Sequence, residues 1–142
     1  MNPKRTALAT AATIAAAGTL GACSSGTATD SSVDYAGAEW ECQTVPDDVM
    51  TRILEGEKTN DGQGVTVEKS TMVAGTDNNF VAADLVFPGE SKPFTAVFTT
   101  PIDGAGPITS ATAGTAQLFN WPETPGGKLD GSYAAEKCLD EV

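Results

Sequence analysis

The spacing of three cysteines constrains the fold of this 142-residue chain more than any other feature of its sequence. Cys42 and Cys138 stand near the two ends of the segment whose composition suits a folded domain, whereas Cys23 directly follows an apolar stretch. A bridge between Cys42 and Cys138 closes a loop of about 96 residues and fixes the beginning of the domain against its end. Disulfides persist in oxidising compartments, so the fold depends on whether the chain is exported.

The first 22 residues carry the features of an export signal. Residues Met1–Arg5 contain two basic side chains and no acid, and Thr6–Leu20 is a mildly apolar stretch of 15 residues. That length is typical of the apolar region of a signal peptide and is short for a membrane-spanning helix. Gly21 and Ala22 supply the small side chains that a signal peptidase requires near its cut. We therefore predict a signal peptide over residues 1–22.

The residues around the first cysteine, Leu20-Gly21-Ala22-Cys23, resemble the bacterial lipobox. The resemblance implies cleavage between Ala22 and Cys23, a diacylglycerol on the Cys23 thiolate, and a further acyl chain such as palmitate on the freed α-amine. Each buried CH₂ of such chains contributes about 0.8 kcal/mol, so two or three chains hold a protein at the extracytoplasmic face of the cell membrane. The alternative is an ordinary signal peptide whose apolar region ends beside a structural cysteine.

With Cys23 lipidated, Cys42 and Cys138 form an even pair in an exported domain, which predicts a disulfide. The chain-entropy model gives a loop of this size about 4–5 kcal/mol of stabilisation. Two free thiols are the alternative. The spacing does not fit a redox-active Cys-x-x-Cys site.

A flexible tether is predicted between the lipobox and the domain. Residues 23–38, CSSGTATDSSVDYAGA, are rich in Ser, Thr, Gly and Ala, and offer little to bury beyond Val33 and Tyr35. A single domain then spans residues 39–142. It starts with the pattern of an amphipathic helix over residues 46–55, in which Thr44 is the candidate cap of a Thr-x-x-Asp box.

Alternating apolar and polar residues predict an antiparallel sheet after this helix. The expected strands are residues 64–74, 80–87, 94–99 and 108–111, with a hairpin turn at Asp77–Asn79. Two short helical segments follow, over residues 115–121 and 132–139. The predicted fold class is α+β: an amphipathic helix packed on a three- or four-stranded antiparallel sheet, C-terminal helical turns and one disulfide.

The ionisable residues limit the classes of partner and the kinds of catalytic site that this chain can have. Eight Lys and Arg side chains stand against 19 Asp and Glu, a net charge of −11, and the chain has no histidine. An acidic surface repels phosphate backbones, so we expect no nucleic-acid partner, and contact with the membrane is expected through the lipid anchor alone. Without histidine there is no Ser-His-Asp triad, Cys-His dyad or histidine-containing metal site, and no cofactor is expected.

Carboxylates are the remaining candidates for chemistry. Three of them lie in turn sequences, namely Asp61, Asp77 and Asp103. Turns commonly require Asp, and the full calcium-loop pattern is missing from all three sequences. A carboxylate pair for glycan hydrolysis would come from Glu39, Glu41, Asp84 and Glu123. The separation of two carboxylates decides that chemistry, and surface solvation is the other role open to these four acids.

Three further residues stand out by their positions. Asp84 interrupts an apolar strand, which predicts that it faces water on the open side of the sheet. Trp40 and Trp121 lie beside the ends of predicted elements, where an aromatic side chain belongs either to the core or to a binding surface. Core packing is the main prediction for both, with Trp40 covering the bridge at Cys42.

The order of short motifs in the folded part resembles small lipoproteins of actinobacteria. These motifs lie between Trp40 and Cys138 and read EWEC, FVAADLVF, FTAVFTT, WP and AAEKC. The resemblance implies an envelope location and a bridged α+β module, and it transfers no catalytic residue. We expect a non-enzymatic module that binds an envelope protein or a small ligand. The alternatives are a small carboxylate-dependent hydrolase of envelope glycans and a phage-type inhibitor or immunity lipoprotein.

Overall fold

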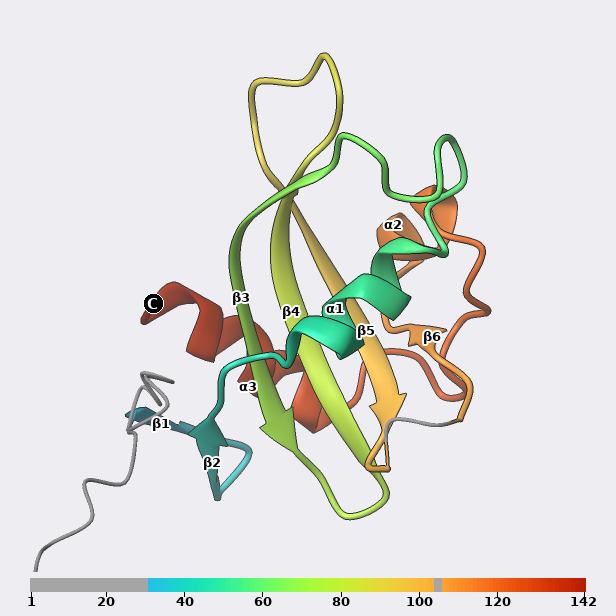
Figure 1. The fold of residues 1–142 in the computed structure, drawn as a ribbon. Coiled ribbons are helices and arrows are strands. Elements are labelled where there is room, and N and C mark those ends of the chain that lie inside the picture. The colour runs from blue at the N-terminus through green and yellow to red at the C-terminus, as the bar shows by residue number, and fades with distance from the viewer. Residues whose placement is uncertain (1–30, 104–105) are drawn as a thin grey trace, which may run out of the picture.

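A computed structural model describes residues 31–103 and 106–142 and confirms the α+β fold (Figure 1). Its larger sheet is antiparallel and has the strand order β3-β4-β5-β6, so neighbouring strands follow one another along the chain. These strands are β3 (Thr66–Ala74), β4 (Asn78–Val86), β5 (Phe94–Pro101) and β6 (Thr109–Ser110). The predicted signal peptide, the cleavage site at Ala22 and the lipidated Cys23 lie outside the described residues.

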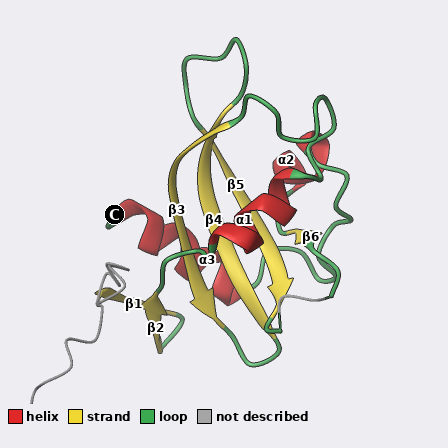
Figure 2. Ribbon diagram, viewed as in Figure 1, coloured by secondary structure: helices red, strands yellow, loops and turns green. Residues whose placement is uncertain are grey.

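Both faces of this sheet are covered, because alternate residues of its strands are apolar on each side. Val81, Ala83 and Leu85 of β4 are buried on the face that carries helix α1 (Asp47–Leu54). Phe80 and Ala82 are buried on the other face, under helix α3 (Asp130–Asp140). Figure 2 shows α1 in front of the strands and α3 behind them. The sheet therefore lies between two helical layers.

The position of Asp84 corrects the prediction of an open sheet face. Asp84 is half-buried on the face that α3 covers, where its Oδ1 accepts a hydrogen bond from Thr95 Oγ1 at 2.6 Å. Glu136 and Asp140 of α3 line the same small surface groove. The prediction was wrong because the C-terminal helix packs on this face of the sheet and leaves Asp84 only at its edge.

A second, two-stranded sheet corrects the predicted tether. Strands β1 (Ser31–Tyr35) and β2 (Ala38–Cys42) form an antiparallel hairpin. Ala36 and Gly37 connect them with φ of 52° and 79°, as the two central residues of a type I′ turn require. Residues from Ser31 onward thus belong to the fold, whereas the tether was predicted to reach residue 38. The hairpin is held because Val33 is buried against the core on its inner face.

The helices begin close to the predicted positions, with one different cap. The N-cap of α1 is Pro46, in extended conformation and with no side-chain capping bond of its own, two residues after the predicted cap Thr44. Asp47 and Asp48 occupy the first turn of α1, where carboxylates interact favourably with the helix dipole. Helix α2 (Ala113–Leu118) does have a side-chain cap, since Thr112 Oγ1 accepts from the backbone N–H of Thr115.

A buried carboxylate organises the loop after α1. Glu57 is 4% exposed, and its two carboxylate oxygens accept the backbone N–H groups of Thr59, Asn60 and Gly62. Burial alone would raise the pKa of Glu57, but these hydrogen bonds outweigh it and hold the pKa below its ordinary value. Glu57 is therefore a structural anion.

Trp121 fixes the same region to the core. Its Nε1 donates to the backbone oxygen of Ile53 at 2.9 Å, and its ring lies so close to Gly56 that a Cβ there would come within 2.2 Å of it. Trp121 is half-buried against the cluster under α1, which agrees with the predicted core role.

Candidate binding groove

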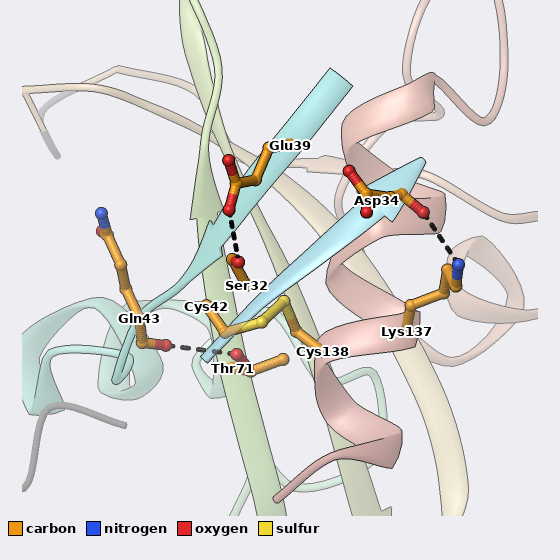
Figure 3. Close-up of a disulfide and its surroundings, with 8 residues drawn as sticks. All are labelled: Ser32, Asp34, Glu39, Cys42, Gln43, Thr71, Lys137 and Cys138. Carbon is orange, nitrogen blue, oxygen red and sulfur yellow. Dashed lines mark hydrogen bonds between the residues drawn. A yellow bond between two sulfur atoms is a disulfide. The ribbon is translucent and has the colours of Figure 1, made fainter. Parts of the chain in front are cut away.

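The predicted disulfide between Cys42 and Cys138 is confirmed. It joins the end of β2 to α3, with the two Cα atoms 5.5 Å apart (Figure 3). Two further contacts hold the hairpin on α3. Lys137 Nζ donates to the backbone oxygen of Asp34 at 2.8 Å, and the rings of Tyr35 and Tyr133 stack with their centroids 5.2 Å apart. The hairpin and α3 thus form one locked unit beside the edge strand β3.

Strands β2 and β3 meet at one point and then diverge. Gln43 and Met72 exchange two backbone hydrogen bonds of 2.8 Å, and Thr71 Oγ1 also donates to the oxygen of Gln43. Beyond this bridge no β2–β3 ladder continues among the described residues. A hollow of about 350 Å³ opens instead between residues 38–40 of β2 and residues 74–76 at the end of β3.

A second hollow of about 470 Å³ lies beside the first. It is bounded by Trp40, by the β3–β4 turn and by the segment 128–131 at the start of α3. Both hollows share Trp40, Gly75 and Thr76, so we treat them as one surface, the Trp40 groove.

Glycines make room for the second hollow. Phe80 lies at its floor, and a Cβ on Gly131 would come within 2.2 Å of the Phe80 ring. A Cβ on Gly75 would come within 2.7 Å of the same ring. Because neither position tolerates a side chain without movement, the turn and the helix can both approach the aromatic ring. The groove floor is therefore set by Phe80 and two glycines.

Trp40 lines both hollows and is half-buried. Its Nε1 donates to the backbone oxygen of Tyr35 at 3.3 Å, and its ring meets Phe80 edge to face with centroids 6.3 Å apart. The ring packs against the core cluster that contains Cys42 and also lines the groove. Both roles considered for this residue, core and surface, thus apply at once.

The rim of the groove is acidic. Glu39, Asp77 and Asp130 line it and are exposed. One basic residue, Lys128, also lines it, and that ammonium group pairs with the Glu136 carboxylate and lies 4.1 Å from the centre of the Tyr133 ring. The positive charge of Lys128 is therefore already engaged, whereas Asp77 and Asp130 form no ion pair within residues 31–103 and 106–142.

The acids considered for catalysis come from three parts of the fold. Glu39 lines the Trp40 groove and accepts a hydrogen bond from Ser32, and Glu123 lines a hollow beside Ser110 and Thr124. Asp84 lies in the groove under α3, and Glu41 is exposed on β2. Glu39 and Glu41 thus share one face of β2, whereas Asp84 and Glu123 lie at two other places on the surface.

The turn acids lie where turn geometry accounts for them. Asp61 has a φ of 51°, a left-handed conformation that Asp adopts more readily than most residues, and Asp77 closes the β3–β4 turn. Within the described ranges there is no group of three or more Cys, Asp or Glu side chains that could hold a metal ion. No helix among those residues is long and apolar enough to cross a bilayer.

Comparison of the chain with protein-family models, curated proteins and solved structures found no match. The chemistry that the groove can recognise therefore follows from its own lining residues and charges. Sequence reasoning singled out Trp40 and Asp77 but missed Phe80, Gly75 and Gly131 as parts of one surface. A glycine at the end of a predicted strand and another at the start of a predicted helix were the available signals.

Proposed function

We propose that the chain is a lipid-anchored lipoprotein of the cell envelope whose domain binds a partner through the Trp40 groove. Cys23 carries the lipid, and the domain stands on the extracytoplasmic side of the cell membrane. The module is non-enzymatic. The observation that carries the binding role is an aromatic groove with an acidic rim, built on a hairpin that a disulfide locks to α3.

Three features support this proposal. The segment Leu20–Cys23 resembles a lipobox, and the Cys42–Cys138 bridge fits a protein that folds in an oxidising compartment. Seven residues lie between Cys23 and Ser31 of the hairpin in the sequence, so Ser31 lies at most about 29 Å from the lipidated cysteine. The domain is thus held close to the membrane, where it meets envelope partners.

The anchor is tested by expressing the full chain in a bacterial host and by fractionating the cells. We expect the protein in the membrane fraction, with an amino-terminal peptide that begins at Cys23 and carries the mass of a diacylglycerol and an acyl chain. The Cys23→Ala variant should lose the lipid, whereas Ser24→Ala, one residue further on, should keep it. An unmodified Cys23 in a soluble mature protein would contradict the proposal.

A further inference from the structure

The Trp40 groove contains a backbone edge that pairs with no strand among residues 31–103 and 106–142. In an antiparallel pair, the N–H and C=O groups of successive residues point alternately to the two sides of a strand. Gln43 directs its groups to Met72 of β3, so Glu41 and Glu39 direct theirs to the same side. Ala74, two residues after Met72, likewise directs its groups toward β2. No backbone hydrogen bond joins Glu41 to Ala74 across the hollow.

Such an edge is a template for an extended polypeptide. Strand addition supplies main-chain hydrogen bonds, and pockets for alternate side chains supply the selectivity. Beside this edge lies the hollow of about 470 Å³ behind Trp40, which is large enough for a long side chain. The groove thus offers both parts of a peptide site.

The acidic rim of the groove favours a cationic side chain in a bound peptide. Asp77 from the β3–β4 turn and Asp130 from the start of α3 both line the hollow, and the ammonium group of Lys128 pairs with the Glu136 carboxylate. The indole ring of Trp40 forms one wall, and aromatic rings attract cations placed over their faces. The whole chain adds to this preference with its net charge of −11.

We infer that the Trp40 groove binds an extended polypeptide segment that carries a lysine or arginine side chain. The segment's backbone pairs with the open edge of β2, and its cationic group lies over Trp40 between Asp77 and Asp130. This inference rests on the proposed function, because it names the partner chemistry of the same site.

The test follows the two indole N–H signals of the ¹⁵N-labelled full chain in a neutral detergent. The probe is an acetylated and amidated peptide, Thr-Lys-Val-Lys-Thr, and its matched control is Thr-Glu-Val-Glu-Thr. We expect the lysine peptide to shift the signal of Trp40 and not that of Trp121, whose Nε1 donates to Ile53 in the layer of α1. The glutamate peptide should shift neither signal.

Charge variants distinguish an effect of the rim carboxylates on peptide binding from an effect on the fold. The double variant Asp77→Asn, Asp130→Asn should weaken binding of the lysine peptide about two- to 25-fold, because each exposed ion pair accounts for about 1.4- to fivefold. The control Asp47→Asn, Asp48→Asn removes the same charge from α1 and should leave binding unchanged. Trp40→Leu keeps an apolar side chain but removes the π face, and it should weaken binding by a similar factor.

Several results would overturn the inference. These are an unmoved Trp40 signal at millimolar lysine peptide, equal shifts with both peptides, or a shift with a chitin oligosaccharide and none with the lysine peptide. Concentration-dependent dimers that cover Trp40 would assign the groove to a second copy of the chain. A lipidated chain that does not bind the lysine peptide would overturn this inference alone. A chain that binds the lysine peptide but carries no lipid would overturn the proposed anchor.

Discussion

Removal of the disulfide is the change whose effect on the free energy of unfolding follows most directly from the structure. The bridge spans 96 residues between Cys42 and Cys138, which are 3% and 0% exposed. A loop of this length lowers the entropy of the unfolded chain by an amount worth about 4.7 kcal/mol at 25 °C. Alanine at both positions avoids leaving buried hydroxyl groups. We therefore expect the double variant Cys42→Ala, Cys138→Ala to lose about 3–5 kcal/mol of its free energy of unfolding.

The loss should begin in the hairpin. Without the bridge, β1 and β2 are held by Val33, by the Tyr35–Tyr133 stack and by the bond from Lys137. Hydrogen exchange should therefore accelerate first at the backbone amides of β1 and β2 and later in β4 and β5.

Urea unfolding, followed by circular dichroism, measures the stability of this variant against the wild type and against Cys23→Ala. The Cys23→Ala control should match the wild type in stability. A loss below about 1 kcal/mol, or uniform acceleration of exchange over both sheets, would show that the bridge does not lock the hairpin to α3.

Three further changes test other parts of the fold, each by urea unfolding. Glu57→Gln should cost about 1–3 kcal/mol at pH 7 because backbone N–H donors lose a charged acceptor, while the exposed Glu55→Gln should cost little. The pKa of Glu57 is lowered from 4.5, so the stabilisation by its carboxylate is complete above that value and is lost as the pH falls through the lowered pKa. The free energies of unfolding of the wild type and of Glu57→Gln should therefore become equal in acid. A difference in free energy that persists in acid would contradict this role. Gly131→Ala should cost about 1–3 kcal/mol because its Cβ would meet the Phe80 ring at 2.2 Å, and an unchanged midpoint would show that the groove floor can move. Thr124→Val should cost about 1–2 kcal/mol because its hydroxyl contacts Thr109 Oγ1 at 2.7 Å and the oxygen of Ser110, whereas the exposed Thr95→Val serves as a control with a smaller effect.

The sequence predicts most of the larger sheet and the bridge. Strand β4 alternates between two apolar faces, and the flanking turn residues mark its ends within two residues. The pairing of Cys42 with Cys138 followed from the leader sequence and from an even count of the remaining cysteines. The strand pattern is a local feature of the sequence and the cysteine pairing follows from a residue count, so neither prediction requires knowledge of which residues meet in the folded structure.

The hairpin and the groove depend on contacts that no short pattern encodes. The turn at Ala36-Gly37 lacks the Asn-Gly or Asp-Gly signal of a type I′ turn, and the strands around it are short and polar. Their stability comes from α3, which lies about 100 residues further along the chain. Gly75 and Phe80 lie more than 50 residues before Gly131 in the sequence, so no local spacing pattern indicates that these three residues meet in the groove.

Site-specific photo-cross-linking in the native envelope tests whether a lipid-anchored domain binds its partner through the Trp40 groove. A photoreactive residue replaces Thr76, which is exposed in the Trp40 groove, and a control carries it at Asp48 on α1. We expect one cross-linked protein at Thr76, joined through a segment that contains lysine or arginine. That adduct should be missing at Asp48 and strongly reduced when Cys23→Ala removes the anchor. Identical adducts at both positions, or an adduct that does not depend on Cys23, would contradict a lipid-anchored module that binds through this groove.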